Sequence, residues 1–217
     1  TRCADVTGVQ TCALPILGAD GARYYLLCGL NEAELFGSGG APLYAALIKA
    51  DKGALSIDMS GQLESELSPG NPPIPWDPVG GRPWYQKGRK YPFVNSNFHP
   101  DFGIAAQDIS SAWAALGYPQ VDGVVTVDVS AVANILREAG PIEVKDFGSV
   151  SADSVVRKVL VDSYREFEVD QFLERRQRNA VLARALAAHL LTRENFLAMT
   201  HGILESIPPR HVQASFS

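Results

Sequence analysis

The chain has 217 residues, of which 46% are hydrophobic and 20% are charged. This composition is typical of a globular protein that is long enough to fold as one domain with a sizeable core. The formal net charge of -5 excludes the basic face that duplex nucleic acid requires, so we expect no nucleic-acid partner. Because the sequence has no apolar run of about 18 residues, we expect any membrane anchor to lie outside these residues.

The start of the chain does not look like natural protein. Residues 5–16 read DVTGVQTCALPI, which resembles the translation of a common sequencing-library adapter. We therefore expect residues 1–16 to be a non-native, adapter-derived segment and residues 17–217 to form a single α/β domain that is incomplete at its C-terminus. Of the three cysteines, only Cys28 then belongs to the domain, where an apolar run predicts a small buried side chain rather than a nucleophile or a disulfide.

The pattern of apolar residues predicts strands and helices in alternation. Short apolar runs, the first of them RYYLLCGL, predict the strands of a mixed sheet at residues 23–30, 44–48, 54–57, 123–127 and 211–216, with a further short strand at 142–144. Apolar residues at helical spacing predict helices that cover this sheet after Asp101 and at residues 129–139, 151–163, 172–191 and 193–206.

A long loop interrupts the pattern between residues 60 and 90, where prolines and glycines exclude regular structure over most of the stretch. Its aromatic residues Trp76, Trp84 and Tyr85 could stack on a sugar or hold the loop against its own core. We favour the second role, because buried aromatic side chains most often anchor loops.

Several motifs along residues 23–217 resemble the family catalogued as domain of unknown function 4012. An apolar strand ends at Asn31 and is followed by Glu34 and the pair Gly39-Gly40. An Asn-Phe-His-Pro-Asp-Phe element at residues 97–102 and a strand and helix at residues 121–144 complete the resemblance. It implies an extracytoplasmic cell-envelope protein whose full-length form carries an N-terminal membrane anchor ahead of this domain.

A more distant resemblance links the chain to the LytR-CpsA-Psr proteins, which transfer glycopolymers from a polyprenyl-pyrophosphate carrier to the cell wall. Residues 27–31 resemble their first strand, residues 121–144 their strand-helix segment, and Arg165 with residues 170–178 their arginine-rich helix start. The resemblance implies a LytR-CpsA-Psr-like fold, truncated at both ends, in which arginines hold a pyrophosphate. Mg²⁺ is a possible cofactor by this resemblance only, and Asn31 stands at the position of a metal-binding Asp.

These patterns select seven candidate ligand-binding residues and no catalytic residue or metal ligand. Arginine forks hold phosphate oxygens, carboxylates bind cations or protons, and asparagine amides bind polar groups. Each candidate also has a structural alternative, namely capping of a loop or of the helix after Asp101, or a solvated basic face. The histidines lack the spacing of a zinc motif. The candidates are Asn31, Glu34, Asn97, Asp101, Arg165, Arg175 and Arg176.

Two functions of different classes remain open at this stage. In one, the domain binds a polyprenyl-phosphate or glycopolymer ligand and acts as a glycopolymer transferase. In the other, it is a non-catalytic envelope scaffold or glycan-binding module. Convergence of Arg165 and Arg176 with Asn31 or Glu34 on one cavity is the arrangement that the first function requires.

Overall fold

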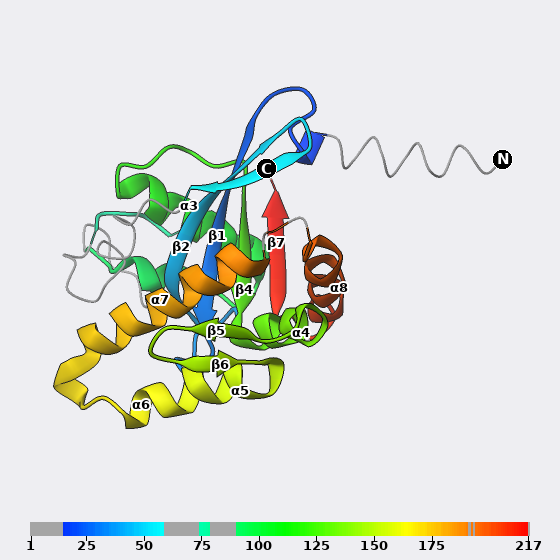
Figure 1. The fold of residues 1–217 in the computed structure, drawn as a ribbon. Coiled ribbons are helices and arrows are strands. Elements are labelled where there is room, and N and C mark those ends of the chain that lie inside the picture. The colour runs from blue at the N-terminus through cyan, green and yellow to red at the C-terminus, as the bar shows by residue number, and fades with distance from the viewer. Residues whose placement is uncertain (1–14, 59–73, 79–89, 191, 193, 217) are drawn as a thin grey trace.

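A five-stranded mixed sheet forms the centre of the computed structural model, which describes residues 15–58, 74–78, 90–190, 192 and 194–216 (Figure 1). The strands stand in the order β3-β2-β1-β4-β7. Neighbours β1 and β4 are parallel, and the remaining pairs are antiparallel. The strand bounds are β1 (Arg23–Asn31), β2 (Ala41–Asp51), β3 (Ala54–Asp58), β4 (Gly123–Asp128) and β7 (Val212–Phe216). All five strands predicted for this sheet are confirmed.

Side chains alternate between the two faces of the sheet, as strand geometry requires. On β1, Leu26 and Cys28 are fully buried in the core against α3 (Phe102–Ala115), which also holds Trp113. Leu27 points to the opposite face, toward α7 (Phe172–Leu190). The sheet therefore separates two apolar layers.

The helices divide between these two layers. The 3₁₀ helix η1 (Phe93–Asn97) packs with α3 on one face. Figure 1 shows α7 crossing the other face, with α4 (Val129–Ala139), α5 (Ala152–Arg157) and α8 (Phe196–Ser206) beside it. No helix within the described ranges is long and apolar enough to cross a membrane.

One predicted helix is interrupted near its C-terminal end. The sequence predicts a single helix over residues 151–163, but α5 runs into a π-helical turn, η2 (Lys158–Asp162), and then into the short helix α6 (Ser163–Arg165). Such π-turns shift the direction of the following side chains and are frequent at functional sites. Here Tyr164 lies in α6, two residues after the end of the turn.

A second sheet was not expected from the sequence. The predicted strand at residues 142–144, β5 (Ile142–Val144), pairs with β6 (Gly148–Val150) in a two-stranded sheet outside the main one. The turn between them closes at Asp146 and Gly148, both with positive φ. The hairpin packs Val144 and Val150 with α4, α5 and α7 in the second apolar layer.

The long Pro/Gly-rich loop is described only in part. Trp76 is buried in the core, where its indole N–H donates to the carbonyl of Tyr91 at 3.3 Å. The anchoring role predicted for the aromatic residues is therefore confirmed at Trp76. Trp84, Tyr85 and the adapter-like residues 1–14 lie outside the described residues.

Candidate functional site

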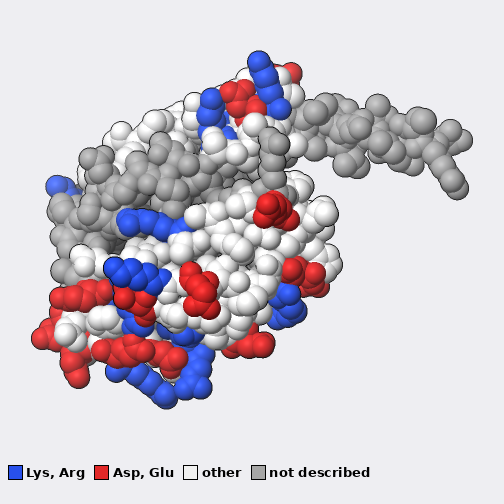
Figure 2. All heavy atoms as spheres, viewed as in Figure 1, with Lys and Arg blue, Asp and Glu red and all other residues white. Residues whose placement is uncertain are grey.

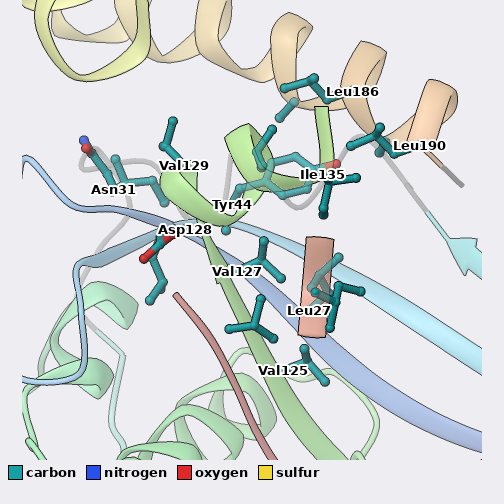
Figure 3. A pocket seen from close by; sticks show the side chains of 18 of the residues that line it. Leu27, Asn31, Tyr44, Val125, Val127, Asp128, Val129, Ile135, Leu186 and Leu190 are labelled. Atoms are coloured by element: carbon teal, nitrogen blue, oxygen red, sulfur yellow. The ribbon is translucent and has the colours of Figure 1, made fainter. Parts of the chain in front are cut away.

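A large apolar cavity lies between the sheet and α7 (Figure 3). Its volume is about 1290 Å³, above the roughly 300–1,000 Å³ of pockets that hold drug-sized ligands. Figure 3 shows side chains of the sheet, such as Leu27 and Val127, on one side and Leu186 and Leu190 of α7 on the other. Small residues of α7, Ala180, Ala183 and Ala187, line the cavity between the leucines. The space exists because α7 presents these small side chains where larger ones would reach the sheet.

Polar groups gather where β1 ends, at the Asn31 end of the cavity. The amide nitrogen of Asn31 donates to the hydroxyl of Tyr164 at 2.6 Å, and that hydroxyl donates to Glu34 at 3.0 Å. Burial and the neighbouring Glu34 carboxylate raise the pKa of Tyr164, so its hydroxyl remains a donor at neutral pH. Asn31 and Glu34, both predicted candidates, are thus brought together by a tyrosine that the sequence did not single out.

Arg175 joins this group through the tyrosine ring. Its guanidinium carbon lies 3.8 Å from the centroid of the Tyr164 ring, in a cation-π contact. A guanidinium stacked flat on a ring keeps its N–H edge available to another partner. Three predicted candidates, Asn31, Glu34 and Arg175, therefore meet at one place.

The structure does not place the other two candidate arginines, Arg165 and Arg176, with this group of residues. Arg165 is exposed at the end of α6, and the side chain of Arg176 lies outside the described part of the structure. Arg178 binds Glu166 and the carbonyl of Asp146 instead. Figure 2 shows acidic and basic side chains intermixed at the lower end of the molecule, where Figure 1 places α5, α6 and the start of α7.

The candidates Asn97 and Asp101 have structural partners. Asn97 is fully buried and donates to the carbonyl of Gly40 at 2.8 Å, which fixes the glycine-rich loop after β1. Asp101 caps α3 by accepting from the N–H of Gly103 at 2.8 Å. Capping was the alternative weighed for Asp101, and the geometry shows that cap.

A second polar cluster lies beside the first; the sequence suggested Glu32 as a possible cation ligand but not its meeting with Asp128 and His211. Glu32, Asp128 and His211 come from three segments, and their side chains meet with donor atoms all within 4.8 Å of one another. The imidazole Nδ1 of His211 lies 2.7 Å from Asp128 Oδ2, and burial raises the pKa of Asp128 to about 6. Asp128 lies 96 residues after Glu32, and His211 lies 83 residues after Asp128, so no local sequence motif joins them. Only the pairing of the strands shows that the three side chains meet.

The Mg²⁺ implied by the resemblance does not fit at Asn31. The side-chain oxygen of Asn31 already accepts the N–H of Ala33 at 3.1 Å, and its nitrogen donates to Tyr164. An amide in these contacts offers no charge to a hard divalent cation, which prefers carboxylates. Glu34 alone would remain as a ligand there.

Known structures share this fold at low sequence identity. A Streptococcus agalactiae protein, gbs0355, matches with a TM-score of 0.50 and 12% identity over 93% of this chain and 70% of its own. An Enterococcus faecalis protein described as a transcriptional regulator matches with a TM-score of 0.50 and 10% identity over 93% of this chain and 69% of its own. Bacillus subtilis TagV matches with a TM-score of 0.48 and 13% identity over 89% of this chain and 74% of its own.

The two neighbours with a TM-score of 0.50 confirm the expected fold class, a mixed central sheet covered by helices. No curated protein matches the chain. The family comparison is more direct, because the model of a protein family of unknown function, DUF4012, matches residues 20–164. This match spans β1 through α6 and includes Asn31, Glu34, Asp128 and Tyr164. The chain therefore belongs to the DUF4012 family.

Proposed function

We propose that this domain binds a polyprenyl-phosphate or a lipid-linked glycopolymer, with the lipid chain in the apolar cavity and the phosphate at the Asn31 end. The observation that carries the proposal is the cavity itself, a large apolar space with a polar group at one end. A large, mostly apolar pocket with a few polar groups at one end is typical of a ligand-binding site.

The apolar walls suit a flexible hydrocarbon. Strand residues Val125 and Val127 and helix residues Leu186 and Leu190 offer no hydrogen-bonding group along the cavity. Burial of each CH₂ group contributes about 0.8 kcal/mol, so a chain of several isoprene units would bind with substantial free energy. A polar glycan would leave hydroxyls unsatisfied along these walls, where Gln177, Asn179 and Gln213 could bind only part of it.

The polar end suits a phosphate. Arg175 provides a planar fork of donors, and the Tyr164 ring, held by the hydrogen bond from Asn31, positions that fork at the end of the cavity. Arg175 thus takes the place that the sequence analysis gave to Arg165 and Arg176. The contribution of Arg176 stays a prediction.

Two forms of the proposal differ in chemistry. As a transferase, the domain would pass a glycopolymer from the polyprenyl carrier to the cell wall from an extracytoplasmic position, held there by a membrane anchor in the full-length protein. As a non-catalytic scaffold or glycan-binding module, it would hold the same ligand without turnover. The cavity favours a lipid-linked ligand in either case, and a transfer assay with lipid-linked glycopolymer separates the two forms.

A pair of alanine variants on α7 tests the lipid site. Ala183 lines the cavity, whereas Ala188 is exposed on the same helix. Ala183→Phe should place a ring in the path of the lipid chain and weaken binding of geranylgeranyl phosphate by at least about tenfold, which corresponds to about 1.4 kcal/mol. Ala188→Phe should leave the affinity unchanged.

Chain length and the head group provide the matching controls. The parent should bind geranylgeranyl phosphate at least about tenfold more tightly than farnesyl phosphate, since one isoprene unit adds several buried carbon atoms. Arg175→Lys should weaken both ligands by roughly tenfold or more, while the exposed Arg157→Lys should not. Equal affinities for the two chain lengths in the parent would refute the lipid site.

A further inference from the structure

The cluster of Glu32, Asp128 and His211 lies at the edge of the sheet where three segments meet. Asp128 ends β4 and pairs with Leu30 of the parallel strand β1, so Glu32 follows close by. His211 precedes β7, and its carbonyl accepts the N–H of Asp128 at 3.1 Å. Ligand sites of open α/β sheets gather at the carboxyl ends of parallel strands.

We propose that Glu32, Asp128 and His211 form a binding site for one divalent transition-metal ion, such as Zn²⁺. This site goes beyond the proposed ligand function and does not depend on it. One imidazole and two carboxylates are the ligand set that such ions accept, whereas Mg²⁺ and Ca²⁺ prefer oxygen ligands alone.

The distances are close to those of a bound ion. Nδ1 of His211 lies 2.7 Å from Asp128 Oδ2 and 3.6 Å from Glu32 Oε1. Atoms that each lie about 2.1 Å from one ion are separated by roughly 3 to 4 Å. All ligand atoms lie within 4.8 Å of one another, so the His211–Asp128 contact must open and the two carboxylates must come to within about 4 Å for one ion to bind all three.

The carboxylates are already oriented by hydrogen bonds from the first turn of α4. Glu32 accepts the N–H of Ser130 at 3.1 Å and its hydroxyl at 2.9 Å, and Asp128 Oδ1 accepts the N–H of Ala131 at 2.9 Å. Asp128 Oδ2 is left for the centre of the cluster. Outer hydrogen bonds of this kind fix ligand geometry in metal sites and set metal affinity.

Charge and burial also favour a cation. Asp128 is only 4% exposed, and Glu32 places a second carboxylate beside it. Among the side chains that the structure describes, His211 is the one basic group that forms an ion pair with either acid. A dication would neutralise both carboxylates, which a single proton on His211 cannot do.

An unsatisfied polar atom lies on the same face. Thr126 is two residues before Asp128 on β4, so its side chain points the same way. Its hydroxyl oxygen is buried and has no hydrogen-bond partner in the described structure. A water molecule on the ion could supply that hydrogen bond, and three protein ligands leave such a position open.

Titration with Zn²⁺ alone tests the site. Chelator-treated protein should bind one ion per chain in calorimetry, and Asp128→Asn and His211→Gln should each weaken that binding by at least about tenfold. Asparagine can still cap α4, and glutamine can still donate to Asp128, so both variants should fold. His201→Gln is the matched control, because His201 lies 3.6 Å and 3.9 Å from two exposed glutamates, Glu138 and Glu205.

A second measurement does not depend on the variants. In the parent, Zn²⁺ should shift the ring resonances of His211 and leave the other three histidines unchanged. Co²⁺ in place of Zn²⁺ should produce visible absorption bands of a protein-bound ion. Absence of binding in the parent would overturn the proposal and leave a simple His211–Asp128 hydrogen bond. Loss of binding in His201→Gln alone, or shifts at another histidine, would likewise overturn it.

Discussion

Gly202 on α8 determines how closely that helix approaches α4, and its substitution tests the packing directly. A Cβ added at Gly202 would lie 2.5 Å from the Cα of Ile135 and 2.7 Å from its backbone nitrogen. Ordinary contacts of this kind are 3.4–4 Å long. Because both opposing atoms belong to the backbone, no side-chain rotation relieves the clash, and α8 must move away by roughly 1 Å.

The expected change in the free energy of unfolding combines two opposing effects of Gly202→Ala. Gly202→Ala gains about 1 kcal/mol of helix propensity, but overpacking against a backbone costs typically 1–3 kcal/mol. Movement of α8 also strains a buried contact, because the amide of Asn134 donates to the hydroxyl of Ser206 at 3.0 Å. We expect a net loss of about 1–2 kcal/mol in the free energy of unfolding.

Urea and thermal unfolding followed by circular dichroism measure this loss. For a chain of this length, it corresponds to a fall in Tm of roughly 2 to 8 °C. Leu197→Ala on the same helix is the control, since Leu197 is 80% exposed and its removal should change the free energy by less than about 0.5 kcal/mol. A Gly202→Ala variant as stable as the parent, or more stable, would show that α8 does not approach α4 this closely.

Further predictions concern buried groups away from the cavity. Burial raises the pKa of the Cys28 thiol to about 12, so mass spectrometry after iodoacetamide treatment should find Cys28 unmodified until the protein unfolds. Burial raises the pKa of Asp122, but hydrogen bonds from the Tyr24 N–H and the Arg23 guanidinium outweigh burial and leave the pKa below its ordinary value. The stability that Asp122 contributes is therefore present above about pH 4 and lost as the pH falls through the lowered pKa, and Asp122→Asn should show a smaller acid-side loss in pH-dependent melts. Asn97→Ala should cost about 2–3 kcal/mol in urea unfolding, because the buried carbonyl of Gly40 loses its donor, and a cost below about 0.5 kcal/mol would contradict that role.

The fold was accessible from the sequence because its strands are apolar and locally bounded. RYYLLCGL and the run at residues 123–127 predicted β1 and β4, and Gly140-Pro141 marked the end of α4. The hairpin of β5 and β6 was only half predicted, because β6 consists of Gly148, Ser149 and Val150 and has little strand signal of its own. The π-helical turn η2 has no sequence rule that would announce it.

The candidate site was only partly accessible, because its members are far apart in sequence. Asn31 and Glu34 were predicted from a local motif, and Arg175 from a cluster of arginines. Tyr164, which joins them, lies 133 residues after Asn31 and gave no signal beyond being one aromatic residue in a helix. Asp128 and His211 were hidden in the same way, since only the pairing of β4 with β7 brings them together.

The turn after β1 places consecutive residues in two different environments. Asn31 binds Tyr164 at the end of the cavity, whereas Glu32 binds Ser130 and faces His211. Neither Glu32 nor His211 lines the cavity, but Asp128 does, so the proposed metal site and the proposed lipid site share one side chain. His211→Gln changes no residue that lines the cavity, whereas Asp128→Asn changes one, so the two variants separate loss of the ion from a direct effect on the lipid. The backbone of the turn is a second shared element, because the N–H of Ala33 donates to the side chain of Asn31, next to Glu32. Energetic coupling between the two sites can pass through Asp128 or through this turn, and by linkage it would act equally in both directions.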